Sequence, residues 1–156
     1  KALARRLPAQ GLKAAYQGPQ PQDLPHRYCR GLIELAETSD FLIIACPGGP
    51  ETRHLIKADV LRALGPDGTL INIARGSVVD EPALIQALKS GAIRAAGLDV
   101  FETEPPTPAE LLACENAVLL PHVGSATHET RQAMAQLVID NLTAHFADQP
   151  LLTAVC

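Results

Sequence analysis

Three side chains with the chemistry to act on a small anionic molecule follow apolar runs of this 156-residue chain. Arg75 has a planar guanidinium, which binds a carboxylate through two parallel hydrogen bonds. Histidine side chains exchange protons near neutral pH, so His122 is a candidate general acid or base. A carboxylate such as Glu104 can hydrogen-bond an imidazole and favour its protonated form. These three residue types could bind an acid and move a proton.

Two short apolar runs, residues 70–74 and 95–98, predict strands that would position Arg75 and Glu104. Both runs lack alternation of polar and apolar residues, which suits parallel strands covered on both faces. Between them, Asp80 can cap a helix, Pro82 lies in its first turn, and Gly91 follows its last turn. The stretch therefore predicts one βαβ unit.

The polar candidates follow successive predicted strands. In open α/β sheets, functional groups gather outside the carboxyl ends of the strands. Four strand ends deliver, in chain order, Cys46-Pro47, Arg75, residues 99–104 and His122. We therefore expect Arg75, Glu104 and His122 to meet at one edge of the sheet.

The remaining elements also follow from apolar runs and from glycine and proline. We expect a helix over residues 1–7 ended by Gly11, a short strand before residue 17, and an extended loop over the three prolines of residues 19–25. Further along, we expect a helical turn over 32–36, a strand over 41–45, a helix through Leu64 with Leu55 and Ile56 on its apolar face, a helix over 109–113, a buried strand over 117–120, and a long helix from Ser125 or Thr127 to about Ala147.

Composition narrows the class of protein. An apolar fraction of 47% is ordinary for a globular domain, and the formal net charge of −4 comes without a basic run, which argues against nucleic acid and anionic membranes as partners. No run reaches the length of a membrane span, and the first residues show no signal-peptide pattern. The four cysteines form no metal-ligand spacing and suit a reduced, cytoplasmic setting.

Each candidate also has a plain structural interpretation. A lone arginine after a strand is more often solvated or salt-bridged, and a lone histidine after proline is more often a surface or packed residue. Glutamates in a proline-rich loop, such as Glu102 and Glu104, usually face solvent. The other histidines, His26, His54, His128 and His145, have no functional context, and no metal site is indicated.

The sequence motifs around these residues favour the functional interpretation over the structural one. Arg75, Glu104 and His122 stand 29 and 18 positions apart, inside the stretches INIARGSVVDEPAL, GLDVFETEPP and LLPHVGSAT. These stretches resemble the D-isomer-specific 2-hydroxyacid dehydrogenases, and ACPGGPETRHLI is similar to their glyoxylate and hydroxypyruvate reductase branch. The resemblance covers nearly the whole chain but only part of such an enzyme.

The resemblance implies an α/β fold: a partial Rossmann-like, doubly wound parallel sheet with a long C-terminal helix. Residues 1–121 would be an NAD(P)-binding domain, and residues 122–156 a helix and tail that return to a substrate domain. No G-x-G-x-x-G occurs among the eleven glycines. We therefore expect a carboxyl-terminal fragment that lacks the first strand and the phosphate-binding turn, with little or no activity by itself.

The activity implied by the resemblance is reversible hydride transfer between NAD(P)H and a small 2-oxo acid such as hydroxypyruvate or glyoxylate. In that reaction Arg75 binds the substrate carboxylate and polarises the keto oxygen, His122 donates the proton, and Glu104 orients His122. By the same analogy Asp99 meets the nicotinamide carboxamide. Residues expected to line the cofactor are Cys46, Pro47, Ile73, Ala74, Arg75, Asp99, His122, Gly124 and Ser125.

The ribose-binding position leaves the cofactor open. Residues 17–23 read QGPQPQD, where reductases of this branch tend to carry arginine, so NADP is favoured only slightly over NAD. Asp23, Arg27 and Arg30 lie nearby, and we interpret them as solvated loop charges. The resemblance also implies a homodimer in the intact protein. The alternatives are a non-catalytic dinucleotide-binding regulatory or assembly module, or a remnant of the same fold.

Overall fold

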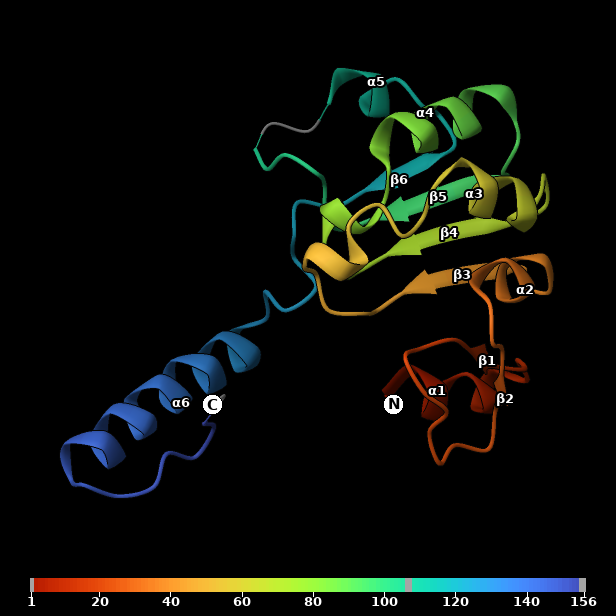
Figure 1. The fold of residues 1–156 in the computed structure, drawn as a ribbon. Coiled ribbons are helices and arrows are strands. Elements are labelled where there is room, and N and C mark those ends of the chain that lie inside the picture. Colours follow the sequence, from red (N-terminus) through yellow and green to blue (C-terminus); the bar gives the residue numbers. More distant parts are fainter. Residues whose placement is uncertain (1, 106–107, 155–156) are drawn as a thin grey trace. The chain divides into compact units, whose positions relative to one another are not determined.

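A computed structural model describes residues 2–105 and 108–154 of the chain. It divides into two compact units, Lys1–Leu120 and Pro121–Cys156. The first unit carries two parallel sheets (Figure 1). One pairs β1 (Ala15–Tyr16) with β2 (Arg27–Tyr28), and the other has the order β3 (Phe41–Ile44), β4 (Thr69–Asn72), β5 (Ala95–Leu98) and β6 (Ala117–Leu119).

The register of the four-stranded sheet brings the strand ends into one row. Ile44 pairs with Asn72, Asn72 with Leu98, and Leu98 with Leu119. Because all four strands run parallel, the segments that follow these residues begin at the same edge. The expectation that the loops after residues 44, 72 and 98 share one edge is therefore confirmed.

Four helices cover one face of this sheet (Figure 1). They are α2 (Leu32–Glu37), α3 (Ala58–Leu64), α4 (Glu81–Ser90) and α5 (Ala109–Leu112). Alternate strand residues such as Leu42, Leu70 and Ala96 are buried beneath them in one hydrophobic cluster. The result is an α/β, Rossmann-like parallel sheet.

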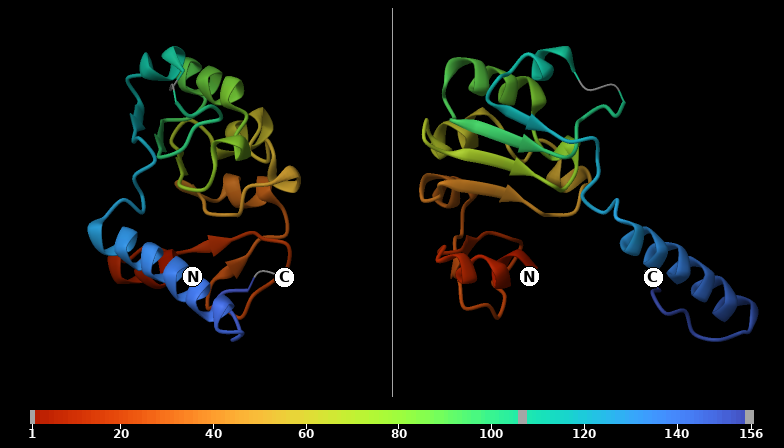
Figure 2. Two further views of the ribbon diagram at one scale, coloured as in Figure 1. Left: turned by 90° about the vertical axis from the view of Figure 1, so that its left-hand side faces the viewer. Right: turned by 180° about the vertical axis from the view of Figure 1, so that it is seen from behind.

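Of the four strands, the two outer ones, β3 and β6, leave apolar side chains exposed on the face away from these helices, whereas each residue of β4 and β5 is buried or half-buried. In the view from behind, the strands lie in front of those helices (Figure 2). On that side Phe41 is 50% exposed and Val118 is 66% exposed, so the last strand is not buried as expected. Apolar composition alone does not distinguish a strand face that is packed within the chain from one that is not.

The capping residues of α4 act as predicted. The Asp80 carboxylate accepts a hydrogen bond from the Ala83 amide at 3.1 Å, and Pro82 lies in the first turn. Gly91 ends the helix with a φ of 72°, a left-handed conformation that glycine adopts without the Cβ clash. Leu84 and Leu88 are buried on the inner side. This helix connects the strand before Arg75 to the strand before Glu104.

Two details of the chain between β1 and β4 differ from the prediction. The helix predicted around Leu55 and Ile56 starts only at Ala58. A 3₁₀ turn, η2 (Pro50–Thr52), comes first, and Ile56 forms a parallel bridge with Val79 instead. Strand β2 was not predicted, because two residues after a proline-rich loop give no periodic signal.

The amino-terminal elements are α1 (Ala2–Arg6) and η1 (Pro8–Gln10).

The second unit contains the long helix α6 (His128–Phe146). Thr127, one of the two predicted caps, accepts a hydrogen bond from the Thr130 amide at 3.2 Å. Met134, Val138 and Leu142 are each more than half exposed. Within the described ranges, no helix is both long and apolar enough to cross a membrane.

Candidate active site

Arg75 follows β4 and lies against the loop that follows β3. Its side chain is exposed, and Nη1 donates a hydrogen bond to the Ala74 carbonyl at 2.6 Å. A Cβ atom on Gly48 would stand only 2.7 Å from Cγ of Arg75. A glycine at position 48 therefore lets the arginine stem pass close to the backbone of the neighbouring loop.

Asn72 fixes the turn that carries Arg75. This side chain is 1% exposed. The sequence analysis did not identify it as a site residue, although a polar residue inside an apolar run is a signal that could have done so. Its amide nitrogen donates to the Arg75 carbonyl, and its amide oxygen accepts from the Ala74 amide, both at 3.0 Å. The Asn72 carbonyl accepts from the Asp99 amide at 3.0 Å. The buried side-chain amide therefore fixes the turn after β4, and the backbone carbonyl of the same residue links this turn to the end of β5.

The loop after β5 packs directly on the residue that follows Arg75. A Cβ atom on Gly76 would lie 1.8 Å from the Phe101 carbonyl and 2.3 Å from the Glu102 nitrogen. The Glu104 carboxylate accepts a hydrogen bond from the Phe101 amide at 2.7 Å, so the turn over residues 101–104 closes on itself. The loops that carry Arg75 and Glu104 are therefore in contact.

Gly76→Ala should be strongly destabilising, because the new methyl group would overlap backbone atoms that cannot rotate away. Overpacking of this kind costs roughly 1–3 kcal/mol, and we expect a loss of at least about 2 kcal/mol in the free energy of unfolding. Urea denaturation measures it. Gly18→Ala is the matched control, because nothing lies within 4 Å of a Cβ there. Equal stabilities of the two variants would contradict the described contact.

The other predicted cofactor residues of the first unit line the same edge. Cys46 and Pro47 follow β3, and burial raises the pKa of the Cys46 thiol, which keeps it protonated at neutral pH. Ile73 is 49% exposed, while Ala74 is 6% exposed. Asp99, the residue after β5, is 7% exposed. An exposed apolar side chain beside a buried carboxyl group is a surface that a planar heterocycle could cover.

His122, Gly124 and Ser125 belong to the second unit. The backbone of His122 has a φ of 54°, a left-handed conformation that is uncommon outside glycine and commonest in asparagine, aspartate and histidine. Such a conformation costs about 1–3 kcal/mol and persists where its surroundings impose it. That His122 meets Arg75 and Glu104 stays a prediction.

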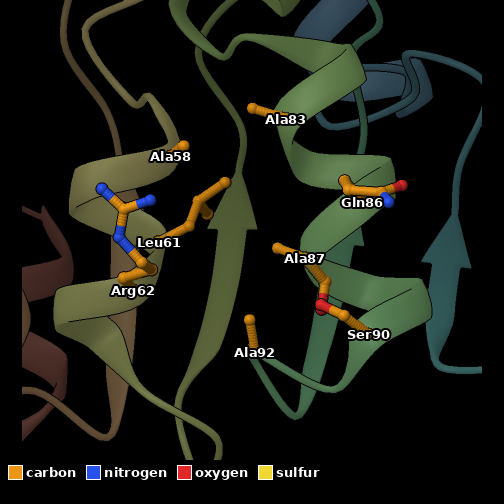
Figure 3. Close-up of a pocket in the computed structure, with 8 residues that line it drawn as sticks. All are labelled: Ala58, Leu61, Arg62, Ala83, Gln86, Ala87, Ser90 and Ala92. Carbon is orange, nitrogen blue, oxygen red and sulfur yellow. The ribbon is translucent and has the colours of Figure 1, made fainter.

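A separate depression lies between α3 and α4 (Figure 3). Its volume is about 330 Å³ and its surface is almost entirely apolar. The lining residues are Ala58, Leu61, Arg62, Ala83, Gln86, Ala87, Ser90 and Ala92. None of the predicted site residues is among them. Across residues 2–105 and 108–154, no group of three or more His, Cys, Asp or Glu side chains could hold a metal ion.

Comparison with known proteins identifies the family. The sequence profile described as D-isomer specific 2-hydroxyacid dehydrogenase, NAD binding domain, matches residues 1–124. The chain belongs to this dehydrogenase family. It is 57% identical over 130 residues to a hydroxyphenylpyruvate reductase of Plectranthus scutellarioides, and 53% identical over 133 residues to a glyoxylate/hydroxypyruvate reductase A of Arabidopsis thaliana. These alignments cover 83% and 85% of the chain, and 42% of each relative.

Solved dehydrogenase structures share the fold. An NADPH-dependent glyoxylate/hydroxypyruvate reductase of Sinorhizobium meliloti, in complex with NADP and malonate, superposes with a TM-score of 0.97 at 51% identity. That comparison covers 99% of this chain and 49% of the reductase. The chain thus spans half or less of the length of these relatives.

Proposed function

We propose that the complete protein that contains this chain transfers a hydride between NAD(P)H and a small 2-oxo acid, such as hydroxypyruvate or glyoxylate. The product is the D-2-hydroxy acid. The observation that carries this proposal is the exposed Arg75 at the carboxyl edge of the parallel sheet, with the Glu104 loop packed against Gly76 beside it. An exposed guanidinium in this position suits an anionic substrate.

Each proposed site residue has one task. Arg75 binds the substrate carboxylate with its two-pronged guanidinium and polarises the keto oxygen. His122 donates a proton to that oxygen as the alkoxide develops. Glu104 accepts a hydrogen bond from His122, which holds the ring in orientation and favours the imidazolium. These three side chains would thereby hold and protonate the substrate.

The residues of the first unit fit the nicotinamide end of a dinucleotide. Gly49 has open space where a side chain would begin, and Ile73 presents an exposed apolar surface close to the turn that carries Arg75. The Asp99 carboxyl group is an acceptor suited to a carboxamide, and we propose that Cys46, Pro47, Ala74, Gly124 and Ser125 complete the lining. When bound, the nicotinamide supplies the hydride.

NADP is the cofactor we favour over NAD. The related Sinorhizobium reductase is solved with NADP. Among the charges near the expected ribose position, Arg27 donates to Glu34 at 2.6 Å, which raises the pKa of Arg27 and lowers that of Glu34. Arg30 and Asp23 are exposed. Arg30 is thus the cation we propose for a 2′-phosphate.

The assembly and setting follow from the same proposal. Residues 1–121 would act as the cofactor domain, and residues 122–156 would return the chain towards a substrate domain. We further propose a homodimer located in the cytoplasm. Gel filtration with light scattering measures the mass of the particle, and a monomer would contradict the dimer.

Steady-state assays of the complete protein test the activity. We expect hydroxypyruvate and glyoxylate to oxidise NADPH, with NADH used less well, and the 156-residue chain to show no turnover. The matched control is glycolaldehyde, which keeps the reducible carbonyl of hydroxypyruvate but lacks the carboxylate and should react poorly. Tight NADPH binding without turnover of any 2-oxo acid would contradict the proposed enzyme and favour a non-catalytic dinucleotide-binding module.

A further inference from the structure

Glu102 connects two loops that are far apart in the sequence. Its Oε1 atom accepts hydrogen bonds from Nη2 of Arg53 and Nε2 of His54, each at 2.9 Å. The Glu102 side chain is only 25% exposed, and that of His54 is 32% exposed. An ionised carboxylate only accepts, so both partners donate. This cluster of Arg53, His54 and Glu102 joins the segment after η2 to the loop after β5.

The backbone on both sides of this cluster is also fixed. The Glu102 amide donates to the carboxylate of Glu81, the first residue of α4, at 3.1 Å. The His54 amide donates to the Ser77 carbonyl at 2.8 Å. The backbone of His54 is left-handed, with a φ of 49°. Glu102 is thus held by its side chain, by its amide and by the contact with Gly76.

The fixed residue lies within the turn that presents Glu104. That turn closes through the hydrogen bond from the Phe101 amide to the Glu104 carboxylate, at 2.7 Å. Phe101 is 7% exposed, so the start of the turn is anchored in the core. Because Glu102 lies inside the turn, releasing its side chain removes a constraint on the backbone that presents Glu104.

We propose that the Arg53, His54 and Glu102 cluster is a positioning device for Glu104. Its task is to hold the Glu104 carboxylate where it can orient the proton donor of the reaction, so this inference rests on the proposed function. None of the three residues is assigned a contact with the substrate, so their role is to position Glu104. Misplacement of a catalytic group by about 1 Å costs up to about 10²-fold in rate. A loosened Glu104 should therefore slow turnover without weakening substrate binding by Arg75.

The test compares variants of the complete protein. Glu102→Ala removes the acceptor, and His54→Asn removes one donor while keeping a residue that tolerates a left-handed backbone. We expect each to lower kcat roughly 10-fold with KM for hydroxypyruvate changed less than about 2-fold, the pattern of a transition-state effect. Glu102→Gln keeps an acceptor oxygen and should recover most of kcat. Hydrogen exchange of the Phe101 amide should quicken in Glu102→Ala.

Asp140→Ala is the matched control, since the Asp140 carboxylate also accepts a side-chain hydrogen bond, from Gln136 at 2.8 Å, but lies on α6. It should leave kcat and the Phe101 exchange rate unchanged. An unchanged kcat in Glu102→Ala, or a raised KM with kcat intact, would overturn the positioning role while the proposed function stands. If the wild type turns over no 2-oxo acid, the proposed function fails instead. Phe101 exchange then decides alone whether Glu102 restrains the Glu104 turn.

Discussion

His122→Ala should lower the turnover of hydroxypyruvate at least about 10²-fold in the complete protein, the usual scale of general acid catalysis. Without the imidazole, the developing alkoxide must take its proton from water. The substrate carboxylate still binds Arg75, so KM should change far less than kcat. Initial rates over a range of hydroxypyruvate concentrations separate the two quantities.

Two further variants make this result specific. His122→Asn keeps a residue that tolerates the left-handed backbone at this position, where φ is 54°, but cannot donate a titratable proton. It should be as slow as the alanine variant. His128→Ala removes an exposed histidine at the start of α6 and should retain wild-type rates. Near wild-type turnover in both His122 variants would remove this residue from the role of proton donor.

Arg75→Lys should lower kcat/KM for hydroxypyruvate roughly 10²-fold, the scale of losing one donor to a developing oxyanion. A lysine ammonium keeps the charge but has no planar fork, so it cannot bind the carboxylate bidentately and also reach the keto oxygen. Both kcat and KM should worsen, because Arg75 contacts the substrate before and during the reaction. Comparing kcat/KM for hydroxypyruvate between the variant and the wild type measures the loss.

Arg94→Lys is the control for charge-conserving changes at a strand terminus. Arg94 precedes β5, donates to the Thr69 hydroxyl at 3.2 Å, and lies over the Phe41 ring at 5.9 Å. It stands at the amino end of the strands, away from the edge that carries Arg75. Its replacement should leave kcat/KM unchanged. If Arg75→Lys were equally silent, another cation would have to bind the substrate carboxylate.

Local signals predicted most elements of the first unit. The cap at Asp80, the stop at Gly91 and the apolar runs of β3, β4 and β5 each depend on neighbours in sequence, and each is present in the structure. Elements that depend on distant partners were missed. Strand β2 exists because it pairs with β1, and the segment at Ile56 is extended because it bridges to Val79.

In the candidate site, too, some features were predicted from the sequence and others were missed. The order of strands predicted that Arg75 and Glu104 follow neighbouring strands at one edge, and their loops do meet through Gly76. Asn72 acts through residues two and three positions away, and its polar side chain inside an apolar run was the signal that could have found it. Glu102 was interpreted as a solvent-facing charge, since its partners Arg53 and His54 stand 49 and 48 positions earlier.

The stereochemistry and stoichiometry of the product test the proposed hydride transfer most directly. The complete protein, given hydroxypyruvate and limiting NADPH, should form one molecule of D-glycerate for each NADPH oxidised, as chiral chromatography against both enantiomers can measure. L-Glycerate as the product would contradict the proposal that the active site forms the D-2-hydroxy acid. No glycerate at all, from protein that still binds NADPH, would contradict the proposed catalysis and favour a non-catalytic dinucleotide-binding protein.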